Sequence, residues 1–222
     1  SLLFNIDQKA TIVAKDQTDA LLKVFVKVFD ESRGYFGSQG HVARFERDLD
    51  NRGQYEQFKA AYTQIAGRDW AYGREEGVLE EANVAKAYAM VTGNSDGAPT
   101  NILTKYRNEY SVSIEDFAGE VKAWVDKQEE GFRLNFFVDE VGQFIGSNTH
   151  LMLNLQTIAE SLNTKCQGRA WVFVTSQEDM DKVVGDRTKQ QGNDFSKIQA
   201  RFRARVKLTS ADVEEVIRKR LL

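Results

Sequence analysis

Two short apolar segments separated by a helical pattern constrain the fold of this chain more than any other feature. Residues 132–138 end in an apolar, β-rich run, and residues 170–174 form a second run of this kind. Ser147 is a candidate N-cap for a helix between them. The apolar stripe of that helix would consist of Leu151, Leu155, Ile158 and Leu162. Strand, helix and strand in this order predict an α/β fold with a parallel sheet.

Four further segments extend this prediction. Residues 2–6 are apolar and predict a strand, and residues 21–29 have an apolar face at helical spacing. The middle of this second segment also alternates like a strand, but we favour the helix. Ser113 is a suitable N-cap for an amphipathic helix over 114–125. A third buried strand, followed by a terminal helix, is predicted at 205–208.

The scarcity of proline favours helices in the rest of the chain. Pro99 is the only proline among 222 residues, so long segments are free to be helical. Residues 34–110 contain a run of apparent helices rich in aromatic and charged side chains and interrupted by glycines. We therefore expect a single domain over 1–222, with an α/β core at about 1–33 and 111–222. The remaining residues, about 34–110, would be a helical insertion, which we call the helical block.

The composition excludes several classes of protein. One cysteine, Cys166, cannot form an internal disulfide, and two histidines, His41 and His150, are too few for a zinc site built from several Cys and His ligands. The apolar runs are far shorter than the roughly 20 residues that a membrane-spanning helix needs. The 30 basic and 33 acidic residues give a formal charge of −3. The composition leaves open a site that uses carboxylates, arginines or backbone N–H groups that bind phosphate.

Two adjacent carboxylates follow the first buried strand. Asp139 and Glu140 come directly after the apolar run of 134–138, and ligands of open α/β sheets bind beyond the carboxyl ends of the strands. Such a pair suits Mg²⁺-dependent phosphoryl chemistry, because one carboxylate can hold metal-bound water while the other orients and deprotonates the attacking water. The alternative is a solvated strand end with no chemical role.

Further polar groups follow in an order that favours the chemical interpretation. Thr175 and Ser176 come after the second buried strand, where hydroxyl groups could contact a phosphate or an attacking water. Arg201, Arg203 and Arg205 precede the third predicted strand and could neutralise charge on a transferred phosphate. Each group alone is more often a solvated or salt-bridged surface residue. Their order along the chain is what favours a phosphoryl-transfer site.

This order resembles a known class of ATPases. Residues 136–140, 172–177 and 201–202 look like the Walker B, sensor 1 and arginine-finger regions of the AAA+ branch of P-loop NTPases. The resemblance implies that Asp139 holds Mg²⁺ and that Glu140 polarises the hydrolytic water. It implies that Ser176 or Thr175 is the sensor 1 group, and that the substrate is ATP.

A closer resemblance is to the large P-loop ATPase of BREX phage-exclusion systems, the BrxC/PglY family. It is carried by residues 137–145, 151–158 and 171–179, and segments of the helical block at 34–47 and 55–59 are also similar. The resemblance implies a bacterial, cytoplasmic ATPase with no membrane association, acting with other defence-system proteins, with any contact to DNA indirect. The arginine finger, Arg201 or less well Arg205, would serve a neighbouring subunit of a homo-oligomer, with Arg203 kept open as a third choice.

The phosphate-binding motif of P-loop NTPases is missing from this sequence. A P-loop needs Gly-x-x-x-x-Gly-Lys-Ser/Thr to hold phosphates, and no Gly-Lys dipeptide occurs in this sequence. The glycine-rich stretch 34–41 lacks the lysine and is expected to be a loop between two helices. We expect a fragment whose Walker A motif and a central strand lie upstream, with little or no ATPase activity alone. Its exposed strand edges could pair with those of a second copy.

Other patterns support weaker interpretations. Residues 93–97 match the Gly-x-Ser-x-Gly nucleophile elbow of hydrolases, with Asp139 and His150 following in hydrolase order, but the elbow needs a preceding strand where this chain predicts a helix. Aromatic residues of the helical block could stack on single-stranded nucleic acid, but core packing is the preferred interpretation. The basic C-terminal third could contact a phosphate backbone. The alternative function is a non-catalytic module that binds protein or DNA.

Overall fold

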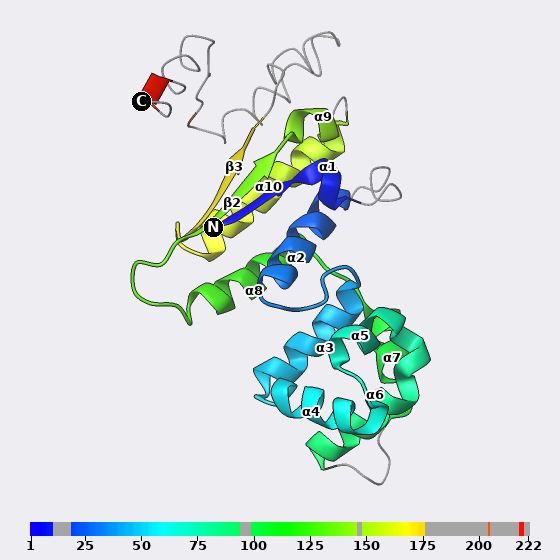
Figure 1. Ribbon diagram of the computed structural model, residues 1–222. Coiled ribbons are helices and arrows are strands. Elements are labelled where there is room, and N and C mark those ends of the chain that lie inside the picture. The colour runs from blue at the N-terminus through cyan, green and yellow to red at the C-terminus, as the bar shows by residue number, and fades with distance from the viewer. Residues whose placement is uncertain (11–18, 94–98, 146–147, 176–203, 205–217, 220–222) are drawn as a thin grey trace. The chain divides into compact units, whose positions relative to one another are not determined.

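The computed structural model describes most of the first four-fifths of the chain (Figure 1). The described residues are 1–10, 19–93, 99–145, 148–175, 204 and 218–219. The chain divides into two compact units, Ser1–Glu178 and Asp179–Leu222. The fold presented below is that of the first unit. The strand predicted at 205–208 and most of the terminal helix lie outside the described residues.

The first unit contains a small parallel sheet. Its strands are β1 (Leu2–Asn5), β2 (Leu134–Asp139) and β3 (Ala170–Val174), in the order β1-β2-β3. Both pairings are parallel, with Phe4 opposite Val138 and Val138 opposite Val174. The strand–helix–strand patterns therefore predicted the α/β class and the parallel sheet correctly.

Helices pack on one side of this sheet. The three long ones are α2 (Ala20–Ser32), α8 (Ile114–Val125) and α10 (Thr149–Lys165). Two short ones, α1 (Ile6–Lys9) and α9 (Val141–Ile145), follow β1 and β2 at their carboxyl ends. Because α10 packs against both α2 and α8, the three long helices form one layer. Helices that connect parallel strands are expected on one side of the sheet when each right-handed connection adds the next strand at the same edge.

The helix starts show why these segments are helical. Ser113 and Asp116 form a capping box at the start of α8, in which the Ser113 hydroxyl accepts from the Asp116 backbone N–H at 3.0 Å. The predicted cap of α10 is wrong, because Asn148 is the N-cap residue and its side-chain oxygen accepts from the N–H groups of His150 and Leu151. Ser147 itself lies outside the described residues. An asparagine amide oxygen can make this contact as well as a serine hydroxyl.

Phenylalanines form the centre of the core between sheet and helices. The Phe25 ring of α2 lies 5.6 Å from Phe4 of β1 and 5.4 Å from Phe136 of β2, between ring centroids. Phe117 of α8 joins them at 6.3 Å from Phe25. Side chains of a strand alternate between faces, so every second residue of each strand enters this core.

The opposite face of the sheet is exposed to solvent. Phe137 and Phe173 lie there on neighbouring strands, with stacked rings whose centroids are 4.6 Å apart. Trp171 continues the row and is 52% exposed, and Leu3 of β1 is 80% exposed. Parallel sheets are normally covered on both faces. In the described part of the chain, the helices cover only one.

Residues 34–110 build a second, helical core. Its elements are α3 (Gly40–Asn51), α4 (Tyr55–Ala66), α5 (Trp70–Glu76), the 3₁₀ helix η2 (Gly77–Glu80), α6 (Glu81–Thr92) and α7 (Ile102–Glu109). The Phe45 ring lies 5.1 Å from Phe58 and 6.2 Å from Trp70, between centroids. Tyr72, in contrast, is 66% exposed. The other aromatics of this block are mostly core residues, as the preferred interpretation of the sequence expected.

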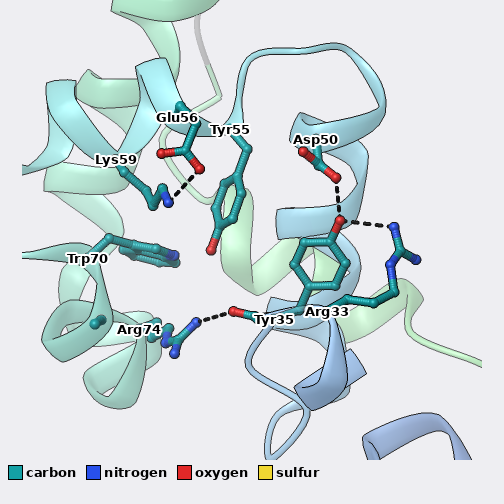
Figure 2. A pocket seen from close by; sticks show the side chains of 10 residues that line it. Arg33, Tyr35, Asp50, Tyr55, Glu56, Lys59, Trp70 and Arg74 are labelled. Atoms are coloured by element: carbon teal, nitrogen blue, oxygen red, sulfur yellow. Dashed lines mark hydrogen bonds and ion pairs between the residues drawn. The ribbon is translucent and has the colours of Figure 1, made fainter. Parts of the chain in front are cut away.

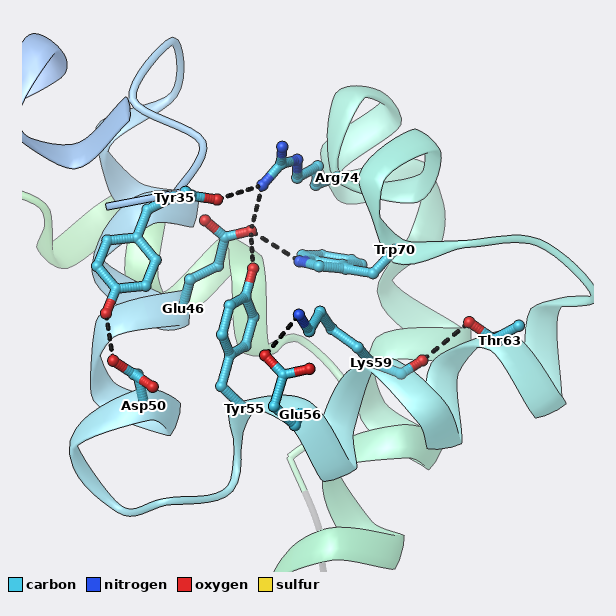
Figure 3. Close-up of polar contacts among 10 residues, drawn as sticks. Tyr35, Glu46, Asp50, Tyr55, Glu56, Lys59, Thr63, Trp70 and Arg74 are labelled. Atoms are coloured by element: carbon cyan, nitrogen blue, oxygen red, sulfur yellow. Dashed lines mark hydrogen bonds and ion pairs between the residues drawn. The ribbon is translucent and has the colours of Figure 1, made fainter. Parts of the chain in front are cut away.

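A buried carboxylate holds the helical block together (Figure 3). Glu46 of α3 is fully buried. Its oxygens accept hydrogen bonds from the Phe36 backbone N–H at 2.6 Å, the Trp70 indole at 2.7 Å and the Tyr55 hydroxyl at 2.8 Å. Arg74 of α5 supplies the positive charge at 3.2 Å. One side chain therefore ties the loop after α2 to α3, α4 and α5, since a buried charge is stable only with such partners.

Substitution Glu46→Gln should strongly destabilise the protein. The amide keeps one acceptor but turns an NH₂ group toward surrounding donors, and the guanidinium of Arg74 loses its counter-charge. We expect a loss of about 3 kcal/mol or more in the free energy of unfolding, measured by urea denaturation. Glu56→Gln is the matched control, because the Glu56 side chain is 83% exposed. Equal unfolding midpoints for the two variants would contradict this role of Glu46.

Candidate functional site

The two carboxylates and one hydroxyl predicted from the sequence lie together at the carboxyl edge of the sheet. Asp139 is the last residue of β2, Glu140 follows it, and Thr175 follows β3. The Thr175 hydroxyl donates to Asp139 Oδ1 and accepts from the Glu140 backbone N–H at 3.3 Å. The Thr175 N–H also donates to the Val138 carbonyl at 3.0 Å, which extends the sheet pairing by one step. The register of β2 and β3 thus places these three residues side by side.

A fourth residue of this cluster, Asn5, was not found by sequence reasoning. It ends β1 and lies opposite Asp139 in the register. Its side-chain N–H donates to the Glu140 carboxylate at 2.5 Å, while its oxygen accepts from the Gln8 N–H and caps α1. The available signal was a polar residue inside the predicted strand 2–6, close to its carboxyl end. We call Asn5, Asp139, Glu140 and Thr175 the edge cluster.

The backbone at Glu140 is strained. Its φ angle is +60°, in the left-handed region that a residue other than glycine adopts at a cost of about 1–3 kcal/mol. Such conformations concentrate at functional sites, where the surrounding structure imposes them. Here the hydrogen bonds of the Glu140 amide to Thr175 and of its carboxylate to Asn5 hold the residue in place. The carboxylate is thereby fixed at the edge of the sheet.

The edge cluster offers only oxygen ligands for a metal ion. Asp139 and Thr175 are exposed, and Glu140 is half-buried. Within the described residues, no group of three or more His, Cys, Asp or Glu side chains could hold a metal by itself. A hard cation with oxygen ligands, of the kind that is shared with substrate phosphates, matches this donor set.

Four other residues predicted for the site, Ser176, Arg201, Arg203 and Arg205, lie outside the described residues. The serine of the Gly-x-Ser-x-Gly match lies outside them too. That match is preceded by helix α6 and not by the strand that a nucleophile elbow requires.

Among the described residues, the surroundings of the histidines and the cysteine do not favour catalysis. His150 is exposed near the start of α10. Burial lowers the pKa of His41, with Arg107 acting in the same direction. Burial raises the pKa of the Cys166 thiol, which opposes formation of the reactive thiolate.

Substitution Asn5→Asp should destabilise the protein in a salt-dependent manner. Aspartate can still cap α1, but it places a second negative charge against Glu140. We expect a loss of about 1 kcal/mol at low salt relative to Asn5→Ser, which keeps a capping oxygen without the charge. The loss should shrink at about 1 M salt, because salt screens the repulsion between partly exposed charges, in urea denaturation at both salt concentrations. A deficit that is independent of salt would show that residue 5 does not face Glu140 in solution.

No family model matches this chain, and no solved structure matches it. In the part of the chain that the structure describes, no helix is both long enough and apolar enough to cross a membrane.

Proposed function

We propose that the edge cluster is the hydrolytic part of an ATPase of the P-loop class, of AAA+ type and similar to the large ATPase of BREX phage-exclusion systems. The observation that carries this proposal is the hydrogen-bonded set of Asp139, Glu140 and Thr175 at the carboxyl ends of two neighbouring parallel strands. Ligands of open α/β sheets bind at such an edge.

Each residue has a role in the proposal that its contacts support. Glu140 polarises and deprotonates the attacking water, since its carboxylate lies at the edge and is oriented by Asn5. Asn5 is therefore a positioning residue. Thr175, or Ser176 beside it, contacts the reacting phosphate as the sensor 1 group. Asp139 holds Mg²⁺ through its exposed carboxylate.

The donor set fits Mg²⁺ bound together with a nucleotide. Mg²⁺ in such sites is usually held by one or two carboxylates and by substrate phosphates, not by a cage of protein ligands. Bound there, the ion would neutralise phosphate charge. The proposal also requires a phosphate-binding loop, and the 222 residues contain no Gly-Lys dipeptide. We also propose a homo-oligomer in which Arg201, Arg203 or Arg205 contacts the nucleotide bound to a neighbouring subunit. Other defence proteins would be partners of this assembly.

ATP hydrolysis by the native polypeptide that contains these residues and a phosphate-binding loop tests the proposal. Glu140→Gln should lower Mg²⁺-dependent turnover by about 10²- to 10⁴-fold, the usual contribution of a general base, and leave ATP binding unchanged. Glu130→Gln is the matched control, because Glu130 is exposed outside the edge cluster. Turnover is measured by phosphate release and ATP binding by calorimetry.

Equal turnover in wild type and Glu140→Gln, or no turnover in either, would overturn the ATPase proposal. The alternative, a non-catalytic module that binds a protein or DNA partner, would then be favoured. That alternative predicts that Glu140→Gln leaves partner binding unchanged.

A further inference from the structure

The helical block contains a pocket that is separate from the edge cluster. Its volume is about 300 Å³, at the lower end of the range for small-ligand sites. It is bordered by the end of α2 with the loop that follows, by the end of α3, and by α4 and α5. Figure 2 shows Tyr35, Tyr55 and Trp70 around it. None of the residues that line it belongs to a strand.

Three of the lining side chains are cations and two are carboxylates, and one of the cations, Arg74, is also paired with Glu46 behind the pocket lining. The cations are Arg33, Lys59 and Arg74. Of the carboxylates, Asp50 accepts from the Tyr35 hydroxyl at 2.5 Å. Glu56 pairs with Lys59 at 2.6 Å but is 83% exposed, so this ion pair is a weak, solvated one.

The two arginines are fixed and still have donors to offer. Arg33 donates to the Tyr35 hydroxyl at 3.0 Å and lies over the Tyr35 ring, and the described residues provide no carboxylate within ion-pair distance of it. The two hydrogen bonds of Arg74, to the Gly34 carbonyl at 3.1 Å and to Glu46 at 3.2 Å, both come from Nη1. Arginine presents five N–H donors, so donors of both guanidinium groups remain for a ligand.

We propose that this pocket binds a small phosphomonoester. Arginine and lysine side chains with remaining donors are the groups that recognise a phosphate, which offers several acceptor oxygens. The pocket volume of about 300 Å³ leaves room for a small organic group attached to the phosphate. The preorganisation comes from the hydrogen bonds of Glu46, which hold Trp70, Tyr55 and Arg74 in place whether or not a ligand is bound. The proposed binding does not depend on ATP hydrolysis at the edge cluster.

A titration of the 222-residue protein tests the proposal. Inorganic phosphate and phenyl phosphate are added separately, and binding is followed by ¹H–¹⁵N NMR at the Gly34 amide and the Trp70 indole. We expect saturable shifts at both groups, with tighter binding of phenyl phosphate. Arg33→Gln and Lys59→Gln should each weaken binding about tenfold, as expected for the loss of one charge-assisted hydrogen bond. Lys86→Gln is the matched control, because Lys86 is exposed and does not line the pocket.

Three results would overturn the proposal. The first is the absence of saturable shifts up to about 10 mM phosphate or phenyl phosphate, beyond the millimolar range of weak binding. The second is equal affinity in wild type, Arg33→Gln and Lys59→Gln. The third is binding of benzoate in place of phenyl phosphate, which would assign the pocket to carboxylates. Unfolding midpoints of the variants are measured in parallel, so that a folded variant with lost binding supports the site.

Discussion

The parallel pairing of β2 with both of its neighbours is the constraint on which the edge cluster depends. Backbone hydrogen bonds fix Asn5 opposite Asp139 and Val138 opposite Val174. Because all three strands run in the same direction, the polar residues at their carboxyl ends meet at one edge. A slip of one residue in β2 would turn Asp139 toward the helices and bring Phe137 into the place of Val138.

The same strand arrangement determines which side chains lie on the uncovered face of the sheet. Side chains alternate along a strand, so Asp139 and Thr175 lie on the face that carries Phe137 and Phe173, while Phe136 and Val138 enter the core. In the described structure the helices pack on the other side, and this leaves Asp139 and Thr175 exposed to a ligand. The strain at Glu140 is a cost that the surrounding hydrogen bonds offset.

The helical block is organised by a different kind of interaction. Glu46 is a buried charge whose partners come from three segments, the loop after α2, α4 and α5, and it fixes the side chains around the pocket. A second buried pair, Asp30 of α2 with Arg47 of α3 at 2.5 Å, joins this block to the helix layer of the sheet. Burial raises the pKa of Asp30, although Arg47 acts in the opposite direction. Asp30 therefore needs Arg47 to remain charged in the core.

The sequence by itself determined the α/β class and several of the elements that the structure describes. Apolar runs and periodicity predicted β2, β3 and α8 and favoured a helix for α2, because burial of an apolar face sets these patterns. It also identified Asp139, Glu140 and Thr175 as candidates, since strand ends can be read from the pattern. Only the tertiary structure revealed Asn5, because its partner Glu140 is 135 residues away in the chain and pairs with it only through the register. The same holds for Glu46 and the pocket, whose charges and rings come from segments with no common spacing. Local sequence sets where a helix or strand forms, and long-range packing decides which polar groups meet.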